Sequence, residues 1–129
     1  MLVEDDSDLA GLLLKKLQPN YHLDWAANLA EAGFYWDNYS YELLILDLSL
    51  PDGSGLAFCR EQLTQRSNLA VLFLTADNQL RTRTACLAQF HSDFLVKPFS
   101  LKELSVRLAL LTQKVQQVAV TSCYRYQQL

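Results

Sequence analysis

The sequence predicts an α/β fold, in which a doubly wound parallel sheet of five strands is covered by five helices. Two observations carry this prediction. Short apolar runs alternate along the chain with segments in which apolar residues recur every three or four positions. The runs also lack polar alternation, which is typical of strands buried on both faces. At 129 residues, half of them hydrophobic, the chain has the size and composition of one globular domain.

Five apolar runs are the candidate strands, and LLIL and AVLFL are the clearest of them. They are Met1–Val3, Leu23–Ala26, Leu43–Leu46, Ala70–Leu74 and Phe94–Val96. Consecutive parallel strands are joined by right-handed crossovers, so the helices between them are expected on both faces of the sheet.

Five helices are expected between and after these strands, each from apolar periodicity and most with a capping residue. The first is capped by Ser7 or Asp8 and runs to about Leu17, and the second starts at Asn28 and runs to about Trp36. The third covers about 56–65, the fourth covers about 78–90, and the fifth starts at Ser100. In the second and fifth, a glutamate three residues after the cap (Glu31 and Glu103) completes a capping-box pattern.

Composition excludes several classes of protein. Eleven basic against fourteen acidic residues give a net charge of −3, which argues against a surface that binds nucleic acid by charge. The three cysteines, Cys59, Cys86 and Cys123, are far apart and form no CxxC pair, so neither a disulfide framework nor a zinc site is expected. No apolar run is long enough to span a bilayer, and no signal peptide is recognisable. We therefore expect a cytoplasmic protein with no membrane segment.

Polar side chains follow four of the five predicted strands. Glu4 and Asp5 follow the first, Asp47 the third, Thr75 the fourth and Lys97 the fifth. The carboxyl ends of parallel strands form the ligand-binding edge of such sheets, so these groups are expected to converge there.

The chemistry of this set points to phosphoryl transfer. Three carboxylates in one pocket repel one another unless cations neutralise them, and one Lys with one Mg²⁺ would do so. Asp47 could then act as a nucleophile that forms an acyl phosphate, and Thr75 could donate a hydrogen bond to a phosphoryl oxygen. Taken singly, each residue has an ordinary alternative as a solvated loop, turn or capping residue. The joint pattern at the strand ends favours a site.

These residues and their surroundings resemble the receiver domain of two-component response regulators. The resemblance covers about residues 1–114 and rests on LVEDD, LLILDLSLPDGSG, LFLTA and FLVKPFSLKEL. It implies the flavodoxin-like receiver fold and a phosphorylation-dependent signalling function, in which the chain catalyses only its own phosphorylation and dephosphorylation and is not otherwise an enzyme.

The resemblance also implies roles position by position. Asp47 matches the aspartate that accepts a phosphoryl group from a sensor histidine kinase. Metal binding would fall to Asp5 directly, Glu4 through water, Asp47 and the backbone carbonyl of Ser49. Thr75 matches the switch hydroxyl, Lys97 the lysine that pairs with the phosphoryl group, and Phe94 the aromatic rotamer switch; the Lys97–Pro98 bond would be cis.

KPFSLKEL resembles in particular the OmpR/PhoB-like transcription factors, which dimerise through the fourth helix, fifth strand and fifth helix. Matching ion pairs across the interface would join Arg83 to Glu103 and Asp93 to Arg107. Residues 115–129 are then a C-terminal extension or a linker towards an effector domain, and any DNA binding would lie outside this chain.

Two alternatives stay open from the sequence. A degenerate receiver would act as a phosphate-independent protein-interaction module. A free-standing aspartyl-phosphate phosphatase typically shows an Asp-x-Asp motif, whereas the position two after Asp47 is Ser49.

Overall fold

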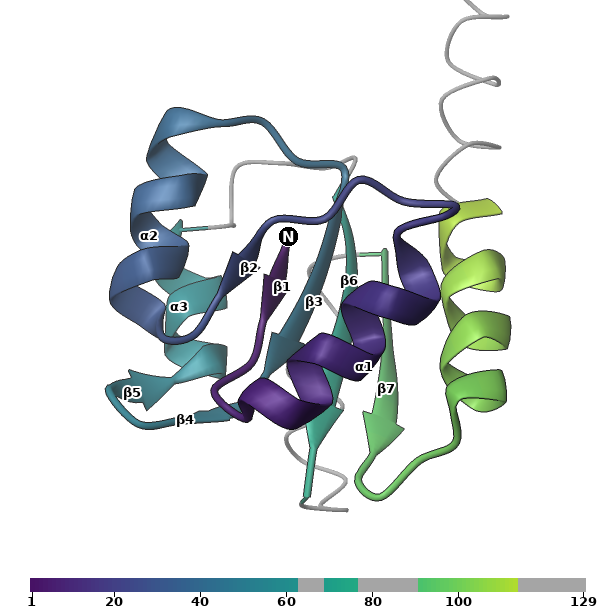
Figure 1. Ribbon diagram of the computed structural model, residues 1–129. Helices are drawn as coiled ribbons and strands as arrows, with labels where there is room; N and C mark the ends of the chain where they lie inside the picture. The colour runs from purple at the N-terminus through teal and green to yellow at the C-terminus, as the bar shows by residue number, and fades with distance from the viewer. Residues whose placement is uncertain (63–68, 77–90, 114–129) are drawn as a thin grey trace, which may run out of the picture.

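A five-stranded parallel sheet is the centre of the molecule, as the computed structural model shows (Figure 1). The structure describes residues 1–62, 69–76 and 91–113. The strands lie in the order β2-β1-β3-β6-β7, with bounds Leu2–Val3 (β1), Trp25–Ala26 (β2), Leu43–Asp47 (β3), Ala70–Thr75 (β6) and His91–Val96 (β7). A short antiparallel hairpin of β4 (Ser49–Leu50) and β5 (Gly53–Ser54) follows β3. The order places β1, β3 and β6 in the interior and confirms the predicted fold class.

Four of the five expected helices fall within the described residues. They are α1 (Ser7–Leu17), α2 (Leu29–Asn38), α3 (Gly55–Gln62) and a helix over residues 101–113. The helix expected over 78–90 and the end of the third beyond residue 62 lie outside the described residues. Within the described ranges, none of the helices is both long and apolar enough to cross a membrane.

The sheet separates two hydrophobic layers, because side chains alternate between its faces. On β3, Leu44 and Leu46 point into the layer that contains Trp36 of α2 and Phe58 of α3. Their neighbours in the same strand point the other way, into the layer formed with α1 and residues 101–113. That second layer includes Leu43, Ile45, Leu13, Leu17, Leu104 and Leu108. All five residues of β3 are buried, which explains why its sequence has no polar alternation.

Several predicted boundaries need correction. Asp6 caps α1 in place of Ser7 or Asp8, since its carboxylate accepts hydrogen bonds from the backbone N–H groups of Asp8 and Leu9 at 3.0 and 3.2 Å. The second strand begins at Trp25, so it is shorter than predicted.

β7 is longer than predicted, because it begins at His91. Its first three residues are polar and half-buried, which is tolerated because β7 is an edge strand of the sheet, although the hydroxyl of Ser92 is buried without a hydrogen-bond partner among the described residues. The predicted caps at Asn28 and Ser100 are confirmed: each side chain accepts a hydrogen bond from the glutamate N–H three residues later, at 2.9 and 3.0 Å.

Asp52 connects the β4–β5 hairpin to α2. Its two carboxylate oxygens accept hydrogen bonds from the N–H groups of Leu29 (2.9 Å) and Ala30 (3.0 Å). These are two of the N–H groups that the first turn of any helix leaves without an internal partner. The bonds also hold the pKa of Asp52 below its ordinary value of 3.8. A residue 22 positions away therefore helps to cap α2, in addition to its own Asn28.

We predict that Asp52→Ala lowers the melting temperature at pH 7, because the first turn of α2 loses a charged acceptor. A depressed carboxyl pKa stabilises the fold above the ordinary value of 3.8, and this contribution is lost as the pH falls through the lower folded-state value. The difference between wild type and variant should therefore shrink below about pH 4. Circular dichroism melts from pH 3 to 8 measure it. Asp37→Ala, which removes an exposed acid from the end of α2, is the control.

Candidate functional site

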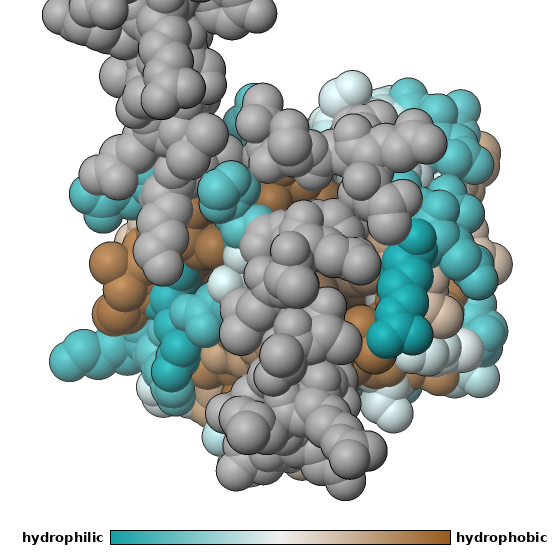
Figure 2. Space-filling model, turned by 180° about the vertical axis from the view of Figure 1, so that it is seen from behind, coloured by the Kyte–Doolittle hydropathy of each residue, from teal (hydrophilic) through white to brown (hydrophobic). Residues whose placement is uncertain are grey.

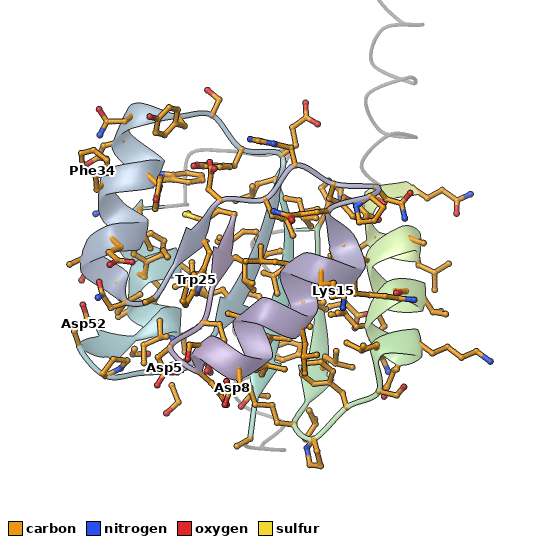
Figure 3. The ribbon with its side chains drawn as sticks, viewed as in Figure 1. Asp5, Asp8, Lys15, Trp25, Phe34 and Asp52 are labelled. Carbon is orange, nitrogen blue, oxygen red and sulfur yellow. The ribbon has the colours of Figure 1, made fainter. Side chains whose placement is uncertain are left out.

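The carboxyl ends of four strands bring the predicted site residues to one edge of the sheet. Glu4 and Asp5 follow β1, Asp47 ends β3, Thr75 ends β6 and Lys97 follows β7. In Figure 3, Asp5 lies at this edge, next to the first turn of α1. Strands β1, β3, β6 and β7 are consecutive neighbours in the sheet, so residues up to 93 positions apart meet.

Lys97 bridges two buried carboxylates. Its Nζ lies 2.6 Å from Oε1 of Glu4 and 2.9 Å from Oδ2 of Asp47. The Glu4 side chain is fully buried and that of Asp47 is 5% exposed, whereas the Lys97 side chain is 26% exposed. Buried charges of this kind are stable only when paired. The ammonium group therefore satisfies both acids from the open side of the site.

Three acids form a cluster of oxygen ligands. One carboxylate oxygen each of Glu4, Asp5 and Asp47 lies within 4.8 Å of the others. Glu4 and Asp47 are buried and Asp5 is exposed. Oxygen-only ligands of this type suit a hard divalent cation. Lys97 alone leaves the three carboxylates with an excess of negative charge, which a divalent cation would offset.

The electrostatics of the pocket are visible in its pKa values. Burial is the main reason why the pKa of Glu4 rises to about 7, and the neighbouring Asp47 raises it further, while Lys97 opposes the shift. Burial by itself lowers the pKa of Lys97, but its hydrogen bonds to Glu4 and Asp47 raise it above the ordinary value. The lysine is thus firmly protonated, and the carboxyl group of Glu4 takes up a proton more readily than an ordinary glutamate does.

The segment between Asp47 and Gly55, which we call the acceptor loop, fixes the orientation of Asp47. The N–H of Ser49 donates to Oδ1 of Asp47 at 3.0 Å, so the two carboxylate oxygens have different partners. The N–H of Gly55 donates a hydrogen bond to the carbonyl of Leu48 at 3.1 Å. A Cβ atom at Gly55 would lie 2.4 Å from the carbonyl oxygen of Asp47. Only glycine fits where the loop passes this close to the end of β3.

Thr75 and Phe94 lie on the neighbouring strands. Thr75 is 5% exposed, and its carbonyl accepts a hydrogen bond from the N–H of Lys97 at 2.8 Å. The ring of Phe94 is buried and stacks on Phe73, its register partner in β6, with ring centroids 5.2 Å apart. The Lys97–Pro98 bond is cis.

One contact near the site was not predicted from the sequence. The indole Nε1 of Trp25 donates a hydrogen bond to the carbonyl of Glu4 at 2.8 Å, which joins β2 to the acidic turn after β1. Trp25 also stands as a register partner of Leu2 in the sheet. A tryptophan in a short strand gives no sequence signal for such a bond, because the acceptor is a backbone group.

The predicted interface residues are only partly placed. Arg107 Nη1 lies 3.1 Å from both carboxylate oxygens of Asp93, within one chain, and its Nε lies 3.4 Å from Oε1 of Glu103. Arg83, the expected partner of Glu103, lies outside the described residues. The Asp93–Arg107 pair therefore exists in the isolated chain, and its exchange across two subunits remains a prediction.

The chain is similar to known signalling proteins over most of its length. Residues 1–109 match the response regulator receiver domain family. The chain is 38% identical to the response regulator RppA of Synechocystis over 118 residues, covering 88% of this chain and 50% of that protein. It is 38% identical to the transcriptional regulatory protein BasR of Escherichia coli over 117 residues, covering 88% and 52%. The chain thus spans about half the length of these relatives.

Solved receiver structures have the same fold. The non-phosphorylated HemR receiver domain of Leptospira biflexa is 34% identical with a TM-score of 0.79, over 86% of this chain and 90% of that one. The response regulator TrrA of Thermotoga maritima, solved in complex with Mg²⁺-BeF, is 30% identical with a TM-score of 0.73, over 85% and 95%.

The chain therefore belongs to the response regulator receiver domain family, and its relatives include regulators of the OmpR/PhoB type such as BasR and PmrA. The matched family is that of a signalling domain.

We predict that Glu4→Gln changes how the stability of the metal-free protein depends on pH. A carboxyl pKa raised from 4.5 to about 7 means that the folded state binds the extra proton in this window, so wild-type stability falls as the pH rises through it. Glutamine at this position cannot ionise. The stability of the variant relative to wild type should rise between pH 5 and 7.5 by on the order of 1 kcal/mol, after allowance for screening at the open side of the pocket.

Urea unfolding in the presence of a chelator measures this difference at each pH. Comparison with the variant is needed because burial also lowers the pKa of the Met1 amino group to about 5. In both proteins this makes stability rise with pH, which is opposite in sign to the effect of Glu4. A difference that does not change with pH would contradict the prediction.

Proposed function

We propose that this chain accepts a phosphoryl group on Asp47 from a sensor histidine kinase, in an Mg²⁺-dependent reaction, and that this switches its output. The observation that carries the proposal is the placement of Asp47: a buried carboxylate, bonded to Lys97 at 2.9 Å and clustered with Glu4 and Asp5. Receiver domains are phosphorylated by histidine kinases, and the family match supports the same partner here.

The chemical step is a transfer between two covalent bonds. A carboxylate oxygen of Asp47 forms a bond to phosphorus while the bond from phosphorus to the kinase imidazole nitrogen breaks. The electron pair of that bond stays on the nitrogen, and a proton that the ring has taken from solvent on its second nitrogen lets it leave as neutral imidazole, without a net change in the oxidation state of any atom. Lys97 Nζ donates a hydrogen bond to Oδ2 of Asp47, so its positive charge lies where it would stabilise negative charge on the transferred group.

The metal would be held by Glu4, Asp5, Asp47 and the carbonyl of Ser49. The fit rests on three carboxylate oxygens within 4.8 Å and on the surplus of negative charge that Lys97 leaves. When bound, Mg²⁺ supplies charge neutralisation of the phosphoryl oxygens. The residues of the chain hold the acceptor carboxylate in place and keep it desolvated.

Thr75 and Phe94 are proposed to carry the switch. Thr75 ends the strand beside Asp47, and Phe94 lies two positions before the end of the next strand. New charge on Asp47 would attract the Thr75 hydroxyl, and Phe94 would repack in the layer that it shares with α2 and α3. A local change in charge would thus alter the surface near β7.

We predict that incubation with acetyl phosphate and Mg²⁺ adds one base-labile phosphoryl group, because the acceptor carboxylate is already oriented by Lys97 and Ser49. Intact-mass spectrometry measures the gain. Asp47→Asn should abolish it, and Asp5→Asn should reduce it at least tenfold through loss of a metal ligand. Asp37→Asn, an exposed acid at the end of α2, is the matched control and should behave as wild type. A mass gain that persists in Asp47→Asn would overturn the proposal.

The alternative function is that of a degenerate receiver, a protein-interaction module that no longer uses phosphate. An Mg²⁺ titration followed by tryptophan fluorescence separates the two, because the Trp25 indole is bonded to the Glu4 carbonyl beside the acid cluster. An active site should give a saturable change that Asp5→Asn removes. No change in wild type would favour the degenerate receiver.

Phosphorylation is further proposed to promote a homodimer through the region around β7 and residues 101–113. Exposed apolar side chains support this surface: Val106 and Leu110 are 51% and 53% exposed. Figure 2 shows hydrophobic side chains at the edge of the molecule that carries this helix. The charged groups of Asp93, Glu103 and Arg107 border them. DNA binding would belong to an effector domain outside this chain, as the transcriptional regulators among its longer relatives suggest.

We predict that Arg107→Glu prevents dimerisation of the phosphorylated chain but not its phosphorylation, because it places three like charges at the proposed interface. The double variant Asp93→Arg/Arg107→Glu restores opposite charges and should recover part of the dimer. Sedimentation velocity measures the dimer fraction. Lys16→Glu, which reverses a charge in the last turn of α1, is the control. Equal dimer fractions in Arg107→Glu and wild type would contradict this interface.

A further inference from the structure

A second pocket lies at the opposite end of the sheet from Asp47. Its volume is about 560 Å³, and it is formed by the loop before β2 and the loop before β3. Leu43, the first residue of β3, lines this pocket, while Asp47, the last residue of the strand, belongs to the site described above. The pocket therefore shares no lining residue with the acid cluster.

Aromatic rings and carboxylates dominate the chemistry of the lining. Tyr21, Tyr39 and Tyr41 contribute rings, and Asp24 and Glu42 contribute acids. The hydroxyl of Tyr41 donates to Oδ2 of Asp24 at 2.6 Å, which orients the carboxylate. The Asp24 side chain remains 31% exposed. Tyrosine faces beside an oriented, accessible carboxylate attract a flat cation, and guanidinium both stacks on the rings and forms paired bonds to the acid.

The charge around the pocket is one-sided. Of the residues that line it, Asp24 and Glu42 are acidic and none is a lysine or an arginine. The amino group of Met1 also lines the pocket, but it donates to the carbonyl of Leu43 at 2.8 Å, and burial lowers its pKa to about 5. Asp24 and Glu42 have no lysine or arginine partner among the lining residues, and the only imidazole near Asp24 is that of His22, which is largely exposed and lies 3.9 Å away.

A strip of aromatic rings leads out of the pocket along α2. Tyr39 lines the pocket and lies 6.2 Å from the ring of Tyr35, which in turn lies 6.0 Å from the ring of Phe34. Tyr39 and Phe34 are 56% and 62% exposed. Figure 3 shows Phe34 on the outer side of α2, away from the sheet. Exposed rings that continue from a pocket favour an extended ligand over a compact one, since a small cation would leave them uncovered.

We propose that this pocket and the adjoining aromatic strip form a docking surface for an arginine-bearing segment of a protein partner. The guanidinium enters between the tyrosines and pairs with Asp24 and Glu42, and an apolar residue next to the arginine packs on the strip of Tyr39, Tyr35 and Phe34. The surface lies at the opposite end of the sheet from the phosphoryl site, so a partner could bind there while Asp47 stays accessible.

The test is an NMR titration of the ¹⁵N-labelled chain with the capped pentapeptide Gly-Leu-Arg-Leu-Gly. Its matched control replaces arginine by citrulline, which has the same shape but no charge. We expect shifts confined to the two pocket loops and α2, and affinity for the arginine peptide roughly tenfold higher than for the citrulline peptide. Equal affinity for both peptides, no binding of either, or shifts centred on Asp47 would each overturn the proposal.

Variants of the chain provide the second arm. Asp24→Asn keeps an acceptor for the Tyr41 hydroxyl while it removes the charge, and should weaken binding of the arginine peptide by roughly fivefold; Glu42→Gln, at an exposed position, should weaken it in the same direction. Asp37→Asn removes an acid that does not line the pocket and should leave the affinity within about twofold. Equal effects of the three variants would show nonspecific charge attraction and overturn the proposal.

A third arm uses N-acetylarginine amide in place of the peptide. Affinity equal to that of the peptide would mean that the strip contributes nothing and that the pocket takes small organic cations, which overturns the docking surface. Phosphorylation by acetyl phosphate should be unchanged in Asp24→Asn.

Discussion

One ammonium group holds together the functional end of this molecule. Lys97 Nζ joins the turn after β1, through Glu4, to the end of β3, through Asp47, from its own position after β7. Two buried acids that close together would otherwise force each other to take up protons. The lysine makes a charged pocket compatible with a packed fold, and it does so from the partly exposed side, where its position can respond to what binds there. This contact positions Glu4 and one oxygen of Asp47, and the N–H of Ser49 on the other oxygen of Asp47 completes the orientation of the acceptor.

The two ends of the sheet manage negative charge in different ways. At the carboxyl ends of the strands, an internal cation neutralises buried acids, and the remaining charge suits a divalent ion. At the amino ends, a tyrosine hydroxyl orients Asp24, and none of the lining residues is a lysine or an arginine. An acid that is oriented but not neutralised is available to an external cation. The overall charge of −3 conceals this arrangement, because most of the acids belong to the first half of the chain and most of the basic residues to the second.

Much of the fold and of the acid site could be predicted from the sequence, because both follow from local patterns. Apolar runs identify β3 and β6, and the position of Asp47 directly after LLIL places it at a strand end. What could not be predicted depends on tertiary partners. The extension of β7 to His91 requires knowledge that this strand lies at the sheet edge, and the bond from Trp25 to a backbone carbonyl has no side-chain signal. Asp52 reads as a turn residue in PDGSG, yet it caps a helix that comes earlier in the chain.

Close contacts at both ends of the acceptor loop restrict the path of its backbone. Asp47 is anchored in β3, Asp52 is bonded to the first turn of α2, and Gly55 passes so close to the carbonyl of Asp47 that no side chain fits. The loop is therefore held at three positions: Asp47, Asp52 and Gly55. The exposed side chain of Ser49 can change in residue type, since the loop uses the backbone N–H of this residue and no side-chain bond. The number of residues between Asp47 and Gly55, in contrast, cannot change without a structural cost. An insertion or deletion would displace either the acceptor or the helix cap, whatever residues it introduced.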